Sequence, residues 1–260
     1  KEYRRQRQMC IRDSQYVIYN DEVYVIEVNP RSSRTIPYIS KVTGVPMVEI
    51  ATRMMFGEKL RDQGYGIGLY PDAEYVAVKV PVFSFEKLHD VDTLLGPEMK
   101  STGEVLGIAR TFDEALYKGL LAAGYKMKHE GGVLVTVRDT DKQEVVPIVE
   151  KYEKLGFKIY ATAGTALTLN QNMIAANTIR KIEEEEPNIM TLFDENKIDY
   201  IITTSKKGRK PQRHSVQMRR RAVERSIVTM TALDTANALA NSLMTNRSVN
   251  DIELVDITTI

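Results

Sequence analysis

The chain has 260 residues, of which 43% are hydrophobic and 27% are charged, a composition typical of a folded globular protein with one or two domains. Its 36 basic and 35 acidic side chains almost cancel, so the overall charge gives no reason to expect nucleic acid as a partner. The single cysteine excludes an internal disulfide, and no apolar run reaches the roughly 20 residues that span a bilayer. We therefore expect a cytoplasmic protein without a membrane segment.

The first residues of the chain differ in pattern from the rest. Residues 1–14 show neither strand alternation nor a helical stripe that continues into the following sequence. The string MCIRDS within them resembles a translated sequencing adapter, so we expect this segment to be a non-native artefact. Residues 15–29 then form two β-rich runs separated by Asn20 and Asp21, which predicts a β-hairpin.

The middle of the chain has a mixed pattern. After Pro30 the sequence predicts irregular chain, a helix over residues 48–60, a strand over 75–85, a loop over 89–107 and a helix over 112–123. Pro81 within the predicted strand favours an edge position or a bend.

From Gly131 onward strands and helices alternate regularly, with strands expected at GGVLVTV, FKIYAT, DYIITT and IVTMTA. Such alternation predicts an α/β fold with a doubly wound, mostly parallel sheet that binds ligands at the carboxyl ends of its strands. Glycines bracket a charged stretch between Gly124 and Gly131, where we place the domain boundary. The predicted domains are therefore residues 15–124, of α+β type, and residues 125–260.

The hairpin carries a first group of candidate functional residues. Glu27 and Asn29 are two residues apart on a strand and so point to the same face, and Gln15 on the partner strand can come near them. Carboxylate and amide oxygens suit a hard cation such as Mg²⁺. Arg31 and Arg34 follow, where guanidinium groups could clamp phosphate or carboxylate. The same residues also suit an amphipathic hairpin with a solvated carboxylate and two surface arginines.

The longer string QYVIYNDEVYVIEVNPRSSRT resembles the end of the ATP-grasp domain in the carbamoyl phosphate synthase large subunit, and the similarity continues through VKVPVFSFEKL and LLGPEMKSTGEVLG. The resemblance implies that Gln15, Glu27 and Asn29 are ligands of Mg²⁺ or Mn²⁺. It also implies that Gln15 and Glu27 contact ATP, and that Arg31 and Arg34 steady the transferring phosphate and the carboxylated intermediate.

The similarity is to the second of the family's two synthetase halves, which uses ATP to phosphorylate carbamate. We therefore expect a carboxyl-terminal fragment of an ATP-dependent ligase that makes carbamoyl phosphate from bicarbonate, ammonia released from glutamine, and ATP. The family's glycine-rich loop and nucleotide-covering lysines lie upstream, so we expect the fragment alone to be inactive. The implied partner is a glutaminase small subunit in a hetero-oligomer, and the product serves pyrimidine and arginine synthesis.

A second group of candidates lies in the alternating part of the chain. Residues 160–165 end a strand and open a helix, so that backbone N–H groups and two hydroxyls face the place where such a sheet binds anions. The same TxGT pattern also suits an ordinary helix cap. Lysines and hydroxyl residues also occur at other loop positions beside strand ends. Taken alone, each lysine also fits an ordinary solvated surface residue.

Together these positions resemble the methylglyoxal-synthase-like domain that follows the second synthetase half and binds nucleotide effectors. The resemblance implies effector contacts from Lys142, Thr162, Thr165, Lys181, Thr203, Thr204 and Ser205. It implies an effector such as uridine monophosphate, inosine monophosphate or phosphoribosyl pyrophosphate. Met230 and Ala232 stand where some members carry a Tyr and a Thr that bind ornithine, so ornithine is not the expected effector, although Glu98 matches an acid of that site.

Two alternative functions fit parts of the sequence. A methylglyoxal synthase would resemble residues 130–250, but its Gly-Gly-Asp segment with a catalytic carboxylate has no counterpart here. A non-catalytic module that binds a nucleotide effector describes what the chain could do alone. The basic string KKGRKPQRH invites a nucleic-acid interpretation, but it lacks interleaved aromatic residues and suits a basic loop beside an anionic effector.

Overall fold

The computed structural model describes residues 13–29, 33–84, 99–204, 213–245, 248, 250 and 252–257. By its internal contacts the chain separates into two compact units, one of residues 1–77 with 254–260 and one of residues 78–253. The unit boundary falls inside a strand and differs from the predicted domain boundary between Gly124 and Gly131, which stays a prediction. Each unit is described by itself.

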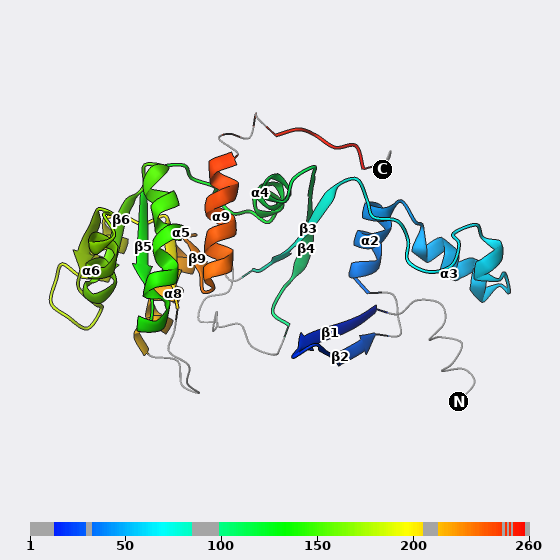
Figure 1. The fold of residues 1–260 in the computed structure, drawn as a ribbon, viewed down its shortest axis with the longest axis horizontal. Coiled ribbons are helices and arrows are strands. Elements are labelled where there is room, and N and C mark those ends of the chain that lie inside the picture. The colour runs from blue at the N-terminus through cyan, green and yellow to red at the C-terminus, as the bar shows by residue number, and fades with distance from the viewer. Residues whose placement is uncertain are drawn as a thin grey trace. The chain divides into compact units, whose positions relative to one another are not determined.

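The first unit begins with the predicted hairpin. Strand β1 (Asp13–Tyr19) pairs antiparallel with β2 (Glu22–Asn29) (Figure 1). Asn20 and Asp21 form the turn with φ angles of 50° and 60°, the left-handed values that a tight two-residue hairpin turn requires. The prediction of a hairpin is confirmed, with a strand that starts two residues earlier than expected.

Short helices follow where the sequence predicts irregular chain. Helix α2 (Thr35–Thr43) contains Pro37 in its first turn, where the missing N–H of proline breaks no helical hydrogen bond. The prediction of irregular chain around Pro37 is therefore wrong. Helix α3 (Met47–Met55) ends earlier than the predicted helix and is followed by the 3₁₀ turn η1 (Leu60–Asp62).

The second unit contains a strand pair and a helix packed on it. Strand β3 (Val76–Val82) matches the prediction, whereas its partner β4 (Gly103–Ala109) lies partly in the predicted loop. Helix α4 (Phe112–Ala122) follows as predicted. The hydroxyl of Thr111 caps it by accepting a hydrogen bond from the backbone N–H of Glu114 at 3.4 Å.

The rest of this unit is a five-stranded parallel sheet of order β7-β6-β5-β8-β9. In chain order its elements are β5 (Gly132–Thr136), η3 (Asp139–Asp141), α5 (Lys142–Lys154), β6 (Lys158–Thr162), α6 (Ala163–Gln171), β7 (Ala176–Ile179), α7 (Ile189–Asp194), β8 (Tyr200–Thr203), α8 (Arg213–Glu224), β9 (Val228–Met230) and α9 (Leu233–Thr245). The predicted α/β class and parallel sheet are confirmed.

The two faces of this sheet carry separate hydrophobic clusters. Val133 and Val135 of β5 point to one face, where side chains of α5, α6 and α9 pack on them. Leu134 points to the other face and belongs to a cluster with side chains of α7 and α8 that includes Phe193 and Met218. Successive β5 residues alternate between the faces, so a continuous apolar run is buried on both.

The strand order places a topological switch point between β5 and β8. From β5 the chain moves to β6 and β7 on one side, and it then returns to add β8 and β9 on the other. Open parallel sheets bind ligands at the carboxyl ends of the strands beside such a point. Among the helices that the structure describes, none is both long enough and apolar enough to cross a membrane.

Candidate functional site

One face of the hairpin brings the predicted metal-binding residues together. Gln15 lies directly opposite Glu27 in the strand register, and the Asn29 amide nitrogen donates a hydrogen bond to Glu27 Oε1 at 3.0 Å. The register shifts between Gln15 and Tyr16, which leaves Ile26 without a partner as a β-bulge. Bulges re-aim side chains and are common beside active sites. One carboxylate and two amide groups therefore share one face.

The donor set fits a hard cation, which prefers oxygen ligands and completes its shell with water and phosphate. A group of three or more His, Cys, Asp or Glu side chains close enough to hold a metal does not occur in the described part of the chain. Among the predicted ligands in the hairpin only Glu27 is acidic, so metal binding there would also need the side-chain amide oxygens of Gln15 and Asn29. Arg34 is exposed just before α2, and Arg31 lies outside the described residues.

The second candidate site is a cavity of about 750 Å³ at the carboxyl ends of β5, β6 and β8. It lies within one compact unit, at the switch point of the sheet. The predicted effector residues that are described all line it: Lys142, Thr162, Thr165, Lys181, Thr203 and Thr204. Ser205 lies outside the described residues, as does Glu98. Residues that are distant in sequence thus meet around one space.

The amino terminus of α6 forms one wall of the cavity. Strand β6 ends at Thr162, whose side chain makes no capping hydrogen bond to the first turn of α6. Thr165 is 1% exposed, and its hydroxyl oxygen is buried without a hydrogen-bond partner although the residue lines the cavity. Buried hydroxyls in folded proteins are normally paired. A helix amino terminus with an unpaired buried hydroxyl beside it is suited to an anion.

Two lysines approach the same wall. Lys142 Nζ is 2.6 Å from Asp139 Oδ1, and the lysine side chain is 21% exposed whereas the aspartate side chain is 82% exposed. Lys181 is exposed on the segment after β7, and its backbone N–H donates to Glu184 Oε2 at 2.7 Å. The cavity therefore combines cationic groups with carboxylates at its solvent-facing edge.

A polar network fixes the loop after β5. The Arg138 backbone N–H donates to the Thr204 hydroxyl at 3.0 Å, and Arg138 Nε donates to both carboxylate oxygens of Asp141 at 2.7 Å. Hydrogen bonds from Arg138, then from Thr204 and Thr140, hold the pKa of Asp141 below its ordinary value, and burial opposes them. This network holds the ends of β5 and β8 together beside the cavity.

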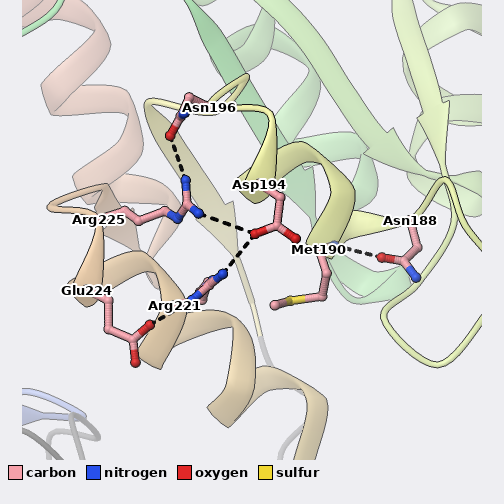
Figure 2. Close-up of polar contacts among 7 residues, drawn as sticks. All are labelled: Asn188, Met190, Asp194, Asn196, Arg221, Glu224 and Arg225. Atoms are coloured by element: carbon pink, nitrogen blue, oxygen red, sulfur yellow. Dashed lines mark hydrogen bonds and ion pairs between the residues drawn. The ribbon is translucent and has the colours of Figure 1, made fainter.

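The opposite wall comes from α7 and α8 and is mainly apolar, with Ile189 and Met218 beside Ser215. Figure 2 shows how these helices are joined. Asp194 Oδ1 accepts hydrogen bonds from Arg221 at 2.8 Å and from Arg225 at 3.3 Å. Arg225 also donates to the side chain of Asn196 at 2.6 Å. These ion pairs join α8 to α7, and Met218 of α8 and Ile189 of α7 both line the cavity.

The sequence did not predict several residues of the cavity wall. Arg138 and Asp139 lie just after Val137, the residue that follows β5, so their position near a strand end could have identified them. Ser215 and Met218 lie within a helix, and no local pattern distinguishes them from the other residues of α8. Met230 is buried, and Ala232 lines a separate cavity of about 300 Å³.

Two family models match the chain. One is described as an MGS-like domain and matches residues 144–231. The other is described as the ATP binding domain of the carbamoyl-phosphate synthase L chain and matches residues 9–63. The first match contains most of the cavity, and the second contains the hairpin.

Similar proteins agree with these matches. A carbamoyl phosphate synthase large chain from Lachnoclostridium phytofermentans is 49% identical over 243 residues, which cover 94% of this chain and 23% of that protein. One from Clostridium botulinum is 50% identical over 228 residues, which cover 87% of this chain and 21% of that protein. The chain thus spans less than a quarter of the length of the curated relatives it matches.

Proposed function

Because the chain is a homologue of the carbamoyl phosphate synthase large chains over most of its length, we propose that its cavity at the switch point binds the phosphate of a nucleotide effector. The observation that carries this proposal is the Thr165 hydroxyl, which is buried and unpaired beside the amino terminus of α6. An anionic oxygen would satisfy this hydroxyl and the N–H groups of the first helical turn together.

The remaining walls support a nucleotide rather than a simple anion. The volume of about 750 Å³ is within the range of small-molecule sites. Ile189 and Met218 offer an apolar surface for a base, and Glu183 and Glu184 offer oxygen atoms that could accept hydrogen bonds from sugar hydroxyls. Uridine monophosphate, inosine monophosphate and phosphoribosyl pyrophosphate are the effectors to test first.

For the whole protein we propose the synthesis of carbamoyl phosphate from bicarbonate, ATP and ammonia that a glutaminase small subunit releases from glutamine. The similarity to large chains and to their ATP binding domain supports this activity. In it, Gln15, Glu27 and Asn29 would hold Mg²⁺ or Mn²⁺, which would neutralise charge on ATP, and Gln15 and Glu27 would contact the nucleotide.

Two arginines complete this proposed catalytic face. Arg31 and Arg34 would orient the transferring phosphate and the carboxylated intermediate through their planar guanidinium groups. The chain would then join a catalytic part, residues 15–124, to a regulatory part, residues 125–260. Regulation requires that the effector bind two states of the enzyme with different affinity.

Calorimetric titration of the 260-residue chain with the three effectors tests the cavity. We expect saturable binding of one of them and a loss of about tenfold in affinity for Thr165→Val, which removes the hydroxyl and keeps the shape. Thr168→Val is the matched control, because the Thr168 hydroxyl on the same helix donates to the Gly164 carbonyl at 3.2 Å and does not line the cavity. If none of the three binds, the proposal is wrong.

The hairpin is tested by Mn²⁺ titration followed by electron paramagnetic resonance. Glu27→Gln should weaken Mn²⁺ binding, because it removes the carboxylate of the set. Glu22→Gln is the control, since Glu22 lies at the turn end of β2 and accepts a hydrogen bond from the Tyr24 hydroxyl. Equal binding by both variants would contradict the assignment of the metal ligands.

A further inference from the structure

Gly164 in the first turn of α6 leaves room that the Lys142 side chain uses. A Cβ atom added to Gly164 would lie 2.7 Å from Lys142 Nζ and 3.5 Å from Lys142 Cε. The backbone of Gly164 is not among those with a positive φ angle. Its backbone conformation is therefore open to other residues, and the missing side chain matters because of the ammonium group that lies against it.

The placement of this ammonium is electrostatically unusual. The amino terminus of a helix carries partial positive charge, so a lysine ammonium there is repelled until an anion arrives. Lys142 comes from the start of α5, and Asp139 holds its ammonium at 2.6 Å. The aspartate is largely exposed, so it compensates the charge of the lysine without filling the cavity. The ammonium, the helix terminus and the unpaired Thr165 hydroxyl all border the same cavity.

We propose that Gly164 is a positioning residue, which lets the Lys142 ammonium lie on the first turn of α6 so that both act on one phosphate group. This inference rests on the proposed function of the cavity. It adds the requirement that residue 164 be glycine. Even the methyl group of alanine would displace the Lys142 ammonium from the phosphate site.

Gly164→Ala separates this role from a structural one. The atom that the new methyl group meets is the end of a flexible side chain, so the fold can accommodate the change by moving Lys142. Alanine is also a better helix former than glycine. We therefore expect Gly164→Ala to keep or raise the midpoint of thermal unfolding while it moves the ammonium away from α6.

Lysine labelling of the ligand-free chain measures the position of Lys142 directly. With a limiting amine-reactive reagent and mass spectrometry, we expect the labelling rate of Lys142 to rise severalfold in Gly164→Ala. Lys154, whose side chain is 62% exposed, serves as the internal standard. Gly103→Ala serves as the control variant, because an added Cβ there meets no atom closer than 3.9 Å. An unchanged rate at Lys142 would overturn the inference.

A binding cycle with inorganic phosphate and uridine monophosphate tests the consequence for the site. Gly164→Ala and Lys142→Met should each weaken binding about tenfold, since each removes the ammonium from the phosphate. The double variant should bind no more weakly than Lys142→Met alone. If the two losses multiply instead, the methyl group blocks the ligand directly and the inference is wrong. If the wild-type chain binds neither these two probes nor inosine monophosphate and phosphoribosyl pyrophosphate, the proposed function fails, while the labelling result still decides whether Gly164 positions Lys142.

Discussion

Asp194 on α7 and Arg221 on α8 form an ion pair with 2.8 Å between Oδ1 and Nη2, and Arg225 donates to the same oxygen from 3.3 Å. Two arginines one turn apart thus share one carboxylate on the neighbouring helix. Figure 2 shows this ion pair between α7 and α8. Ile189 at the start of α7 and Met218 on α8 line the cavity, so the ion pair joins two helices that contribute apolar side chains to its wall.

Asp194→Ala should lower the midpoint of thermal unfolding by about 2–4 °C, because it leaves both arginines without their shared partner. The difference from wild type should shrink in 1 M NaCl, which screens partly exposed charges. Glu150→Ala is the control: Glu150 pairs with Lys154 within the exposed surface of α5, so its loss should change the midpoint less. Equal effects of the two variants in calorimetry would show that Asp194 does not hold α8.

The pKa of Asp141 predicts how stability responds to acid. Arg138 lowers this pKa in the folded state, so the carboxylate contributes stability above its unfolded pKa of about 4, and this contribution is lost as pH falls through the lower folded value. Asp141→Asn should therefore be less stable than wild type at pH 7, and the difference should narrow towards pH 3. Urea unfolding at pH 7, 5 and 3 measures this, and a difference that stays constant with pH would contradict the assignment.

Two buried tyrosine hydroxyls should contribute differently to stability, because they take part in different hydrogen bonds. The Tyr152 hydroxyl has one proton, which it donates to the Ala236 carbonyl at 3.0 Å with Met230 Sδ as a second acceptor at 3.6 Å, and burial raises its pKa. The Tyr200 hydroxyl donates to the carbonyl of Lys128 and accepts from its N–H, both at 2.8 Å. Replacement by Phe should cost about 1 kcal/mol at Tyr152 and more at Tyr200, measured as the free energy of unfolding. A smaller loss at Tyr200 would contradict this interpretation.

The packing of α4 on β4 should be intolerant of any side chain at Gly107. An added Cβ would lie 1.9 Å from the Ala115 carbonyl oxygen and 2.5 Å from the Gly119 nitrogen, both backbone atoms that cannot move alone. Gly107→Ala should therefore destabilise the chain by about 3 kcal/mol or more. At Gly119 the contact is with the Val80 side chain at 2.8 Å, so Gly119→Ala should cost less. The midpoints of thermal unfolding of Gly107→Ala, Gly119→Ala and the control Gly103→Ala measure this order of destabilisation.

The parallel sheet could be predicted because its strands are short apolar runs between helices with clear periodicity. Strand β7 could not, because Ala176–Ile179 is only four residues long and two of them are exposed polar residues. Helix α2 was missed since Pro37 suggests irregular chain unless the helix start is known. Strand β4 was hidden by the glycines at positions 103 and 107, one of which is required by the close approach of α4.

The part of the candidate site that lies at the carboxyl ends of strands could be predicted from the sequence. Thr162, Thr165 and Thr204 stand next to the strands whose carboxyl ends meet, so sequence order and the parallel sheet bring them together. The contact between Lys142 and Gly164 depends on the side-chain path of one lysine across two elements, and no sequence pattern contains it. The apolar wall from α8 likewise depends on tertiary packing against α7.

The strand order has a consequence for how the chain folds during synthesis. Leu134 in β5 pairs with Tyr160 in β6 and with Ile201 in β8, so the two edges of β5 are completed at different times. The first partner follows within a single strand-helix unit, whereas the second arrives only after the chain has passed residue 200. Until then an apolar central strand presents an open edge, which is a site for pairing with other chains. Pairings so far apart in sequence also form slowly. The centre of this sheet, which is its most protected part in the folded state, is thus the part most exposed to aggregation before the chain is complete.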